Sequence, residues 1–363
     1  MDIVYLTALH AISGMGSQRL TALLDHYGEA RAAWEDSACW HKIPGLTGET
    51  ARQLRLGKSE VDAERSYEVF LESGARLTHL YDEDYPELLK NIYDPPVLLY
   101  YIGELAQSHD ICVAMIGSRR ATAYGTQAAA MLAKEVAYQG IYVVAGMARG
   151  IDSVCHQAAM EAGGRTLAVL GSGVDVVYPR ENEKLYRRIA ENGAVISEFP
   201  LGTLPKPGHF PMRNRVISGL SHGVVVVEAG EKSGTLLTVE HALSQGRDVF
   251  AVPGPITSPG SVGTNRLLKQ GCKPVLTGKD IWEEYITRGK ASPGFAKNAR
   301  DFALSEEERE VLQLLTMPVH FDRLAEELGM EPSKLASMLT LWEIRGIVKQ
   351  LPGKYYLCDV VDF

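Results

Sequence analysis

Basic side chains gather in one stretch of an otherwise acidic chain. The 363 residues carry a formal net charge of −8, yet residues 199–215 contain Lys206, Arg213 and Arg215 and no acidic residue. Cations placed this closely attract anions, and a phosphate is the simplest anion for them to hold. The stretch therefore predicts a local anion site, which the surrounding elements have to position.

Apolar runs alternate with helical patterns from residue 110 to residue 276, which is typical of an α/β domain with a parallel sheet and right-handed crossovers. The runs at 224–227 and 249–252 are wholly apolar and short, as expected of strands buried on both faces. The expected strands are 111–116, 141–144, 166–170, 194–196, 223–227 and 249–252.

Small or polar residues follow every expected strand. Because the carboxyl ends of parallel strands meet at one edge of a sheet, we expect these segments to converge there. Several of them lead directly into a helix, whose free N–H groups and positive dipole end favour an anion. The edge therefore predicts a phosphate site. Its segments are 117–120, 146–152, 171–173, 197–198, 228–235 and 253–254.

No motif in this set is decisive alone. The segment 171–173 lacks the third glycine of a dinucleotide fingerprint, and the chain contains neither a GxxxxGK[ST] loop nor an HExxH motif. A plain strand-to-helix turn explains any one glycine loop equally well. Six such loops converging on several arginines and a lysine make that explanation weaker for the whole set.

Composition limits the class of protein. At 45% hydrophobic and 23% charged, the chain is long enough for two or three globular domains. Its five cysteines are far apart and form no CxxC pair, so neither a disulfide framework nor a zinc site is predicted, and a reducing cytoplasm fits best. No apolar run approaches the length that spans a bilayer, and we expect no membrane segment.

Residues 1–70 are expected to form a small helical domain, SAM-like or of the double helix-hairpin-helix type. Two similar turns, at 12–16 and 43–48, place glycines before a helix. Such turns either bring backbone N–H groups to a phosphate or simply join packed helices. The scarcity of basic residues beside them favours the second interpretation.

The C-terminal residues 302–363 predict a winged helix, after a linker at 288–301 that contains glycine, serine and proline. Amphipathic patterns at 305–315, 320–328 and 333–344 precede two short extended segments. This module holds 11 acidic and 6 basic residues, which favours a protein-contact or structural role over binding in a duplex groove. The central domain would then span 71–287.

Several motifs together resemble the DNA-processing protein A family, DprA or Smf. The segments that carry the resemblance are 117–119, 144–152, 173–175, 178–182, 209–211, 213–220, 233–235 and 252–254. The resemblance implies an extended Rossmann-like domain that binds single-stranded DNA and forms a homodimer. It also implies that the protein protects incoming DNA and loads the recombinase RecA during natural transformation. No catalytic residue, metal or cofactor is implied.

The resemblance also implies which residues line the DNA site. Single strands are held by cations along the phosphates and by rings on which bases stack, with no need to read the sequence, and residues 206–215 offer both. We expect Phe210 to lie on a loop, because prolines and a glycine surround it, although it could instead plug that loop into the core. The expected site residues are Gly117, Ser118, Arg119, Lys184, Lys206, His209, Phe210, Arg213, Asn214, Arg215, Ser233, Gly234 and Thr235.

An enzyme is the alternative. The segment 234–236 also resembles the phosphate loop of lysine-decarboxylase-like nucleotide phosphoribohydrolases, which carry an acidic residue directly after it. This chain has Leu237 and Thr238 there, so the catalytic carboxylate is missing from its usual place. Asp152, Glu198 and Glu228 remain possible carboxylates, but a strand-end acid more often caps a helix or pairs with an arginine.

Overall fold

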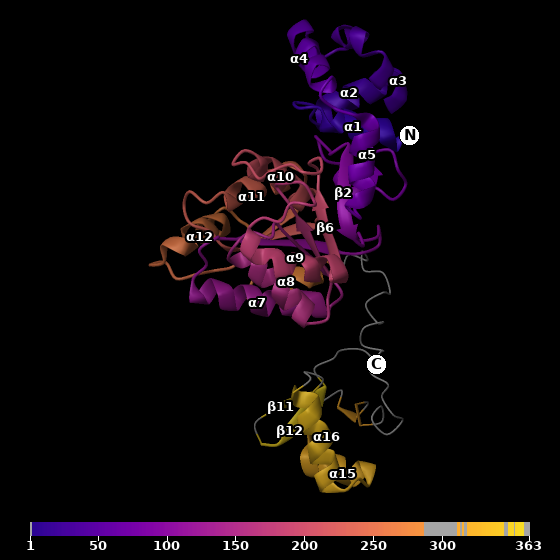
Figure 1. Ribbon diagram of the computed structural model, residues 1–363. Coiled ribbons are helices and arrows are strands. Elements are labelled where there is room, and N and C mark those ends of the chain that lie inside the picture. Colours follow the sequence, from indigo (N-terminus) through magenta and orange to yellow (C-terminus); the bar gives the residue numbers. More distant parts are fainter. Residues whose placement is uncertain are drawn as a thin grey trace. The chain divides into compact units, whose positions relative to one another are not determined.

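The computed structural model describes residues 2–286 and 311–358, except for 313, 316–317, 345–347 and 352 (Figure 1). The chain divides into two compact units, Met1–Phe295 and Ala296–Phe363, and each is described by itself. The linker expected at 288–301 and most of the helix expected at 305–315 lie outside the described residues.

The first unit begins with helices, as the sequence predicts. Two expected turns join α1 to α2 and η1 to α4, and in them Gly14 and Gly45 have φ values of 84° and 86°. Glycine adopts this left-handed conformation without the steric penalty of a Cβ atom. The elements are α1 (Ile3–Ala11), α2 (Ser17–Tyr27), α3 (Ala30–Glu35), the 3-10 helix η1 (Ser37–Lys42), α4 (Gly48–Lys58) and α5 (Ala63–Glu72).

These helices share a core with the edge of the sheet that follows. Leu6 and Leu9 of α1 belong to the same buried cluster as Val97 and Tyr100. His10 lies buried with Nδ1 3.2 Å from the Tyr100 hydroxyl, and burial lowers the pKa of His10 to about 4. The N-terminal helices are therefore fixed to the sheet by apolar packing around a neutral histidine.

Within the described residues of this unit, nine strands form one sheet. Neighbouring strands from β6 to β9 run parallel, whereas β1, β2 and β6 pair antiparallel. All six predicted strands are confirmed to within one residue at each end. In spatial order the strands are β1 (Arg76–His79), β2 (Leu98–Gly103), β6 (Gly193–Ser197), β5 (Thr166–Val169), β4 (Tyr142–Ala145), β3 (Cys112–Gly117), β7 (Gly223–Glu228), β8 (Asp248–Ala251) and β9 (Lys273–Pro274).

Helices connect the strands and cover the sheet. The longer ones follow the parallel strands, as crossovers require. They are α6 (Glu87–Lys90), α7 (Ala123–Tyr138), α8 (Ile151–Glu161), η2 (Arg180–Asn182), α9 (Glu183–Asn192), α10 (His209–Gly219), α11 (Thr235–Ser244), η3 (Pro259–Ser261), α12 (Val262–Lys269) and α13 (Lys279–Ile286).

Both faces of the parallel strands are buried. Along β3, Val113 and Met115 belong to a core with α7 and α8, whereas Ala114 and Ile116 belong to a core with α10 and α11. Figure 1 shows these helix pairs on opposite sides of the sheet. Because successive side chains of a strand point to opposite faces, a strand covered on both sides is apolar throughout. The predicted α/β core with a Rossmann-like parallel sheet is therefore confirmed.

The second unit has the architecture of a winged helix in its described residues. Strands β10 (Val319–His320), β12 (Tyr355–Cys358) and β11 (Val348–Leu351) form a small antiparallel sheet in that order. Helices α15 (Phe321–Leu328) and α16 (Pro332–Ile344) pack on it through a core that includes the buried Trp342. No helix among the described residues of the chain combines the length and apolar character needed to cross a membrane.

Candidate functional site

A cavity opens where the strand order of the sheet reverses. The chain proceeds from β3 through β4 and β5 to β6 on one side, then returns to β7 on the other side of β3. Loops leaving β3 and β7 therefore diverge, and a crevice forms outside the carboxyl ends of the strands. This carboxyl-edge cavity has a volume of about 660 Å³, and its lining includes Gly117, Ser118, Arg119, Arg120, Asp152, Tyr178, Phe210, Arg213, Asn214, Ser233, Gly234 and Thr235.

The loop after β3 brings two cations to the cavity. Arg119 and Arg120 are exposed, and neither forms an ion pair with any described residue. The Arg119 guanidinium lies 5.1 Å from the centre of the Phe210 ring, within the range of a cation–π contact. The backbone of Ser118 fixes this loop, since its N–H donates to the Glu228 carbonyl at 2.8 Å. An anion entering the cavity meets these arginines first.

The carboxylate of Glu228 supports the same loop through hydrogen bonds to Thr122. It is buried, and Oε2 accepts hydrogen bonds from the Thr122 N–H at 3.1 Å and the Thr122 hydroxyl at 2.8 Å. A Cβ atom on Gly125 would overlap this oxygen, so the close approach requires glycine there. Glu228 is not among the residues that line the cavity. Its contacts make it a support for the loop and for the start of α7.

Arg213 and Asp152 form the buried floor of the cavity. Arg213 Nη1 donates to the Gly146 carbonyl at 2.9 Å and to the Val169 carbonyl, which ties the loop after β4 to the end of β5. The Asp152 carboxylate accepts a hydrogen bond from the Gly146 N–H at 3.0 Å. Burial raises the pKa of Asp152 and lowers the pKa of Arg213 to about 10, while the attraction between the two charges opposes both shifts.

Phe210 is helical, and the prediction that it lies on a loop is wrong. Helix α10 begins at His209, so Phe210 and Pro211 occupy its first turn. Proline is tolerated there because the first N–H groups of a helix have no intrahelical acceptor. The half-buried Phe210 ring lies 5.5 Å from the Tyr178 ring, centre to centre. Phe210, Arg213 and Ile217 share one helix face, which lines the cavity.

The start of α11 forms another part of the cavity wall. The Ser233 hydroxyl donates to the Thr235 hydroxyl at 2.9 Å and accepts from the Thr235 N–H at 3.3 Å. With Gly234 between them, these residues place the positive end of the helix dipole at the cavity beside the arginines of the β3 loop. Two exposed cations, a helix terminus and aromatic rings thus surround one space, an arrangement that can hold phosphates and stack bases.

Comparison with known proteins identifies the family. The family model described as DNA recombination-mediator protein A matches residues 76–286, and the DprA winged helix domain model matches residues 295–354. The chain belongs to the DNA recombination-mediator protein A family.

Curated relatives and solved structures agree with this assignment. DNA processing protein DprA of Bacillus subtilis is 40% identical over 253 residues, which are 68% of this chain and 85% of that protein. Protein Smf of Escherichia coli is 38% identical over 282 residues, 75% of each chain. The structure of DprA from Streptococcus pneumoniae aligns with a TM-score of 0.65 and 33% identity, covering 78% of this chain and 96% of that one.

The description of a second solved relative names a ligand. DNA processing protein A from Helicobacter pylori aligns with a TM-score of 0.53 and 29% identity, covering 60% of this chain and 98% of that one. That structure is described as giving insight into the single-stranded DNA binding mode of the H. pylori protein.

Four residues expected at the site of this family member lie outside the cavity lining. Arg215 is buried, with Nε 3.0 Å from Asp94 and Nη2 bonded to Glu198, so its side chain is committed elsewhere. His209 stacks on Phe199 with ring centres 4.3 Å apart. The other two, Lys184 on α9 and Lys206 just before α10, are exposed.

Three charged or aromatic lining residues were missing from the predicted site. Arg120 directly follows Arg119 in the same turn, and that adjacency is the signal that could have identified it. Tyr178 lies in one of the segments that resemble the family, where an aromatic residue beside a proline could have suggested a stacking surface. Asp152 was considered only as a possible catalytic carboxylate. Within the described part of the chain, no three His, Cys, Asp or Glu side chains are grouped as a metal site requires.

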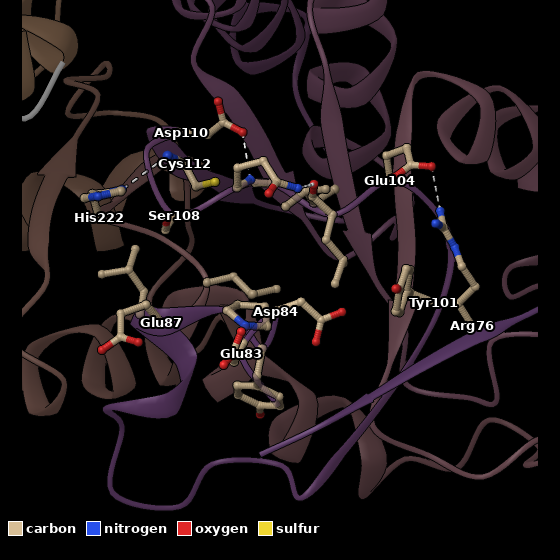
Figure 2. A pocket seen from close by; sticks show the side chains of 18 residues that line it. Arg76, Glu83, Asp84, Glu87, Tyr101, Glu104, Ser108, Asp110, Cys112 and His222 are labelled. Carbon is tan, nitrogen blue, oxygen red and sulfur yellow. Dashed lines mark hydrogen bonds and ion pairs between the residues drawn. The ribbon is translucent and has the colours of Figure 1, made fainter. Parts of the chain in front are cut away.

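A second cavity lies at the opposite, amino edge of the same sheet. This amino-edge cavity has a volume of about 270 Å³ and is bordered by Cys112, which begins β3, and His222, which precedes β7 (Figure 2). Its one lining arginine among the described residues, Arg76, is paired with Glu104 at 2.8 Å. Carboxylates dominate the rest of its charged lining: Glu83, Asp84, Glu87, Glu104 and Asp110.

Proposed function

We propose that this protein binds single-stranded DNA in the carboxyl-edge cavity as a non-enzymatic mediator of recombination. The observation that carries the proposal is the contact of Arg119 with the Phe210 ring at the wall of a cavity that also contains Arg120. A cation next to an aromatic ring provides for a phosphate and its base together. The description of the H. pylori relative as a single-stranded DNA binder supports the same ligand.

The geometry favours a single strand over a duplex. Inside a duplex each base is covered on both faces by its neighbours, so its faces are not accessible to a protein ring. Phe210 and Tyr178 are part of the cavity wall and can contact only a base that has left its stack. Binding of this kind depends on an unpaired strand.

The family assignment also supports a proposal about the biological role. We propose that the bound strand is incoming DNA, that the protein protects it in the cytoplasm, and that it loads RecA during natural transformation. Membership of the DNA recombination-mediator protein A family supports this role. We further propose that the protein acts as a homodimer and that the winged-helix unit, with its excess of acidic residues, contacts protein rather than DNA.

For the domains we propose 1–70, 71–287 and 302–363, with a linker at 288–301. The start of β1 at Arg76 and the two matched family models support this division.

The phosphoribohydrolase alternative lacks a suitable carboxylate in the described structure. Leu237 and Thr238 line the cavity at the position where those enzymes carry an acid. Glu228 supports the β3 loop through Thr122, and Glu198 is paired with Arg215. Asp152 does line the cavity, but backbone N–H groups and Arg213 already surround its carboxylate. We therefore propose that the site binds without turnover.

A direct comparison of ligands tests the proposal. Fluorescence anisotropy with a labelled single strand, the same strand as a duplex, and a nucleoside monophosphate as competitor measures three affinities under one salt condition. We expect the single strand to bind much more tightly than the duplex, and the monophosphate to compete only weakly. Equal affinity for single strand and duplex would contradict the proposal, as would release of a free base from the monophosphate.

A further inference from the structure

Arg213 differs from the other arginines of the cavity because it is almost completely buried, with 4% of its surface exposed. Its Nη1 atom is committed to the carbonyls of Gly146 and Val169. No acceptor for Nη2 is found among the described residues. Nη2 is also not one of the fully buried side-chain atoms that lack a hydrogen-bond partner. Nη1 therefore organises loops, whereas the N–H groups of Nη2 are not fully enclosed and have no acceptor among the described residues.

Two cavities meet at Arg213. It lines the carboxyl-edge cavity and a smaller neighbouring one, and it shares the lining of both with Phe210, Tyr178 and Arg119. Phe210 and Arg213 are three residues apart on α10 and so lie on the same helix face. A base stacked on the Phe210 ring would therefore have its edge close to Arg213.

A buried carboxylate partly offsets the charge of Arg213. The buried carboxylate of Asp152 lines the same cavity and attracts the guanidinium. A phosphate placed at this floor would gain little net attraction and would approach the negative charge of Asp152. A neutral acceptor, such as the carbonyl of a base, gains the hydrogen bond without that repulsion. Phosphates are better placed at the exposed and unpaired Arg119 and Arg120.

We propose that Arg213 is a specificity-determining residue that donates a hydrogen bond to the carbonyl oxygen of a base stacked on Phe210. Guanine, thymine and hypoxanthine present such an oxygen on the edge where adenine presents an amino group. Adenine places N–H against N–H and is disfavoured. The inference rests on the proposed function, and it departs from the expectation that binding needs no base discrimination.

The test compares two strands in the full-length chain. Oligo(deoxyinosine) and oligo(deoxyadenosine) of equal length differ at each base in the group on C6 and in N1, which donates in hypoxanthine and accepts in adenine. We expect the wild-type protein to bind the inosine strand at least fivefold more tightly. In Arg213→Met and Arg213→Lys the ratio of the two affinities should fall at least threefold, while the slope of log affinity against log salt stays unchanged. Comparing ratios between proteins cancels the difference in stacking between the free strands.

Arg119→Met is the matched control, because it removes a cation from the same cavity without touching the floor. It should lower the affinity for both strands by the same factor and make the salt slope shallower by about 0.7, the value for one lost phosphate contact. If the Arg213 variants do not fold, equal affinity of the wild-type protein for the two strands still overturns the inference.

Equal affinity of the wild-type protein for both strands, or a salt slope that becomes shallower in Arg213→Met, would overturn the inference while leaving single-strand binding intact. Failure of every strand to bind would instead overturn the proposed function.

Discussion

The two cavities at opposite edges of the sheet have opposite electrostatic character. Among the described residues, the carboxyl-edge cavity is lined by three arginines and one aspartate, and the amino-edge cavity by five carboxylates and one arginine. Parallel strands place helix starts at the first edge, where α11 presents its positive end, and helix ends at the second. Strand direction thus makes one edge suited to anions, although the whole chain carries a net charge of −8.

The charged side chains at the two edges also differ in whether they have hydrogen-bond or ion-pair partners. At the amino edge, Asp110 accepts a hydrogen bond from the Gln107 N–H at 2.7 Å, and Asp84 accepts one from the Thr78 hydroxyl at 2.9 Å. Figure 2 shows the arginine of this cavity, Arg76, paired with Glu104. At the carboxyl edge, Arg119 and Arg120 have no acidic partner among the described residues. Charges without partners are the ones available to a ligand.

The largest effect on single-strand affinity is expected when both unpaired arginines are removed. Hydrogen bonds to charged groups contribute about 1.5 to 3 kcal/mol each, so Arg119→Ala/Arg120→Ala should lower single-strand affinity by about 3 kcal/mol, or more than 100-fold. The salt slope should become shallower by about 1.4, since each phosphate contact contributes about 0.7. Anisotropy titrations at several salt concentrations measure both quantities.

Arg76→Ala is the control from the amino edge. It removes an arginine that also borders a cavity but is paired with Glu104. Its single-strand affinity and salt slope should match those of the wild-type protein. If Arg76→Ala weakens binding as much as the double variant does, the assignment of the ligand to the carboxyl edge is wrong.

A smaller effect is expected for Phe210→Ala. Loss of one stacking surface should cost about 1 to 3 kcal/mol of binding, and the salt slope should not change because no charge is removed. The ring is half-buried against Tyr178, so the melting temperature should fall by only a few degrees. Anisotropy and thermal unfolding by circular dichroism measure the two effects. A variant that melts far earlier yet binds normally when folded would show that Phe210 is only a packing residue.

Glu228→Ala probes the support beneath the cationic loop. The Thr122 N–H loses its acceptor, so we expect the free energy of unfolding to fall by about 1 to 3 kcal/mol and the affinity to fall several-fold. Glu228→Gln keeps an acceptor oxygen, so its free energy of unfolding and its single-strand affinity should stay close to those of the wild-type protein. Urea unfolding and anisotropy measure these changes. If wild-type protein hydrolyses a nucleoside monophosphate and Glu228→Ala does not, the site is an enzyme and Glu228 is not merely a support.

The smallest effect is expected from removing residues 302–363. This segment has nearly twice as many acidic as basic residues, so its loss should change single-strand affinity less than about threefold. Anisotropy of the truncated chain measures it, with circular dichroism to show that the remaining residues are folded. A loss of tenfold or more would show that the winged-helix unit belongs to the DNA site.

The sequence predicted the sheet well and its edges less well. The strands β3 to β8 are short apolar runs between turn residues, and their length distinguishes them from buried helices. The strands β1, β2 and β9 are not among the six expected strands. These strands lie at or near the sheet edges, where one neighbour or one covered face leaves a weaker apolar pattern.

The site was predicted where it depends on backbone topology and missed where it depends on side-chain direction. The glycine and hydroxyl loops at 117–118 and 233–235 lie in the cavity because strand order places them there. Arg213 and Arg215 are two residues apart on a helix and so point to different faces, one into the cavity and the other to Glu198. A predicted helix start at His209 would have assigned the two arginines to different helix faces. The prolines of 205–211 indicated a loop instead.

Photocrosslinking tests most directly which cavity holds the strand. Single-stranded DNA containing 5-bromodeoxyuridine is bound to the full-length protein, irradiated, and the linked peptides are identified by mass spectrometry. Aromatic residues border both cavities, Tyr178 and Phe210 at the carboxyl edge and Tyr85 and Tyr101 at the amino edge. Crosslinks at Tyr178 or Phe210, reduced in Arg119→Ala/Arg120→Ala, are the predicted result. Crosslinks confined to Tyr85, Tyr101 or the winged-helix residues Tyr355 and Tyr356 would contradict the account.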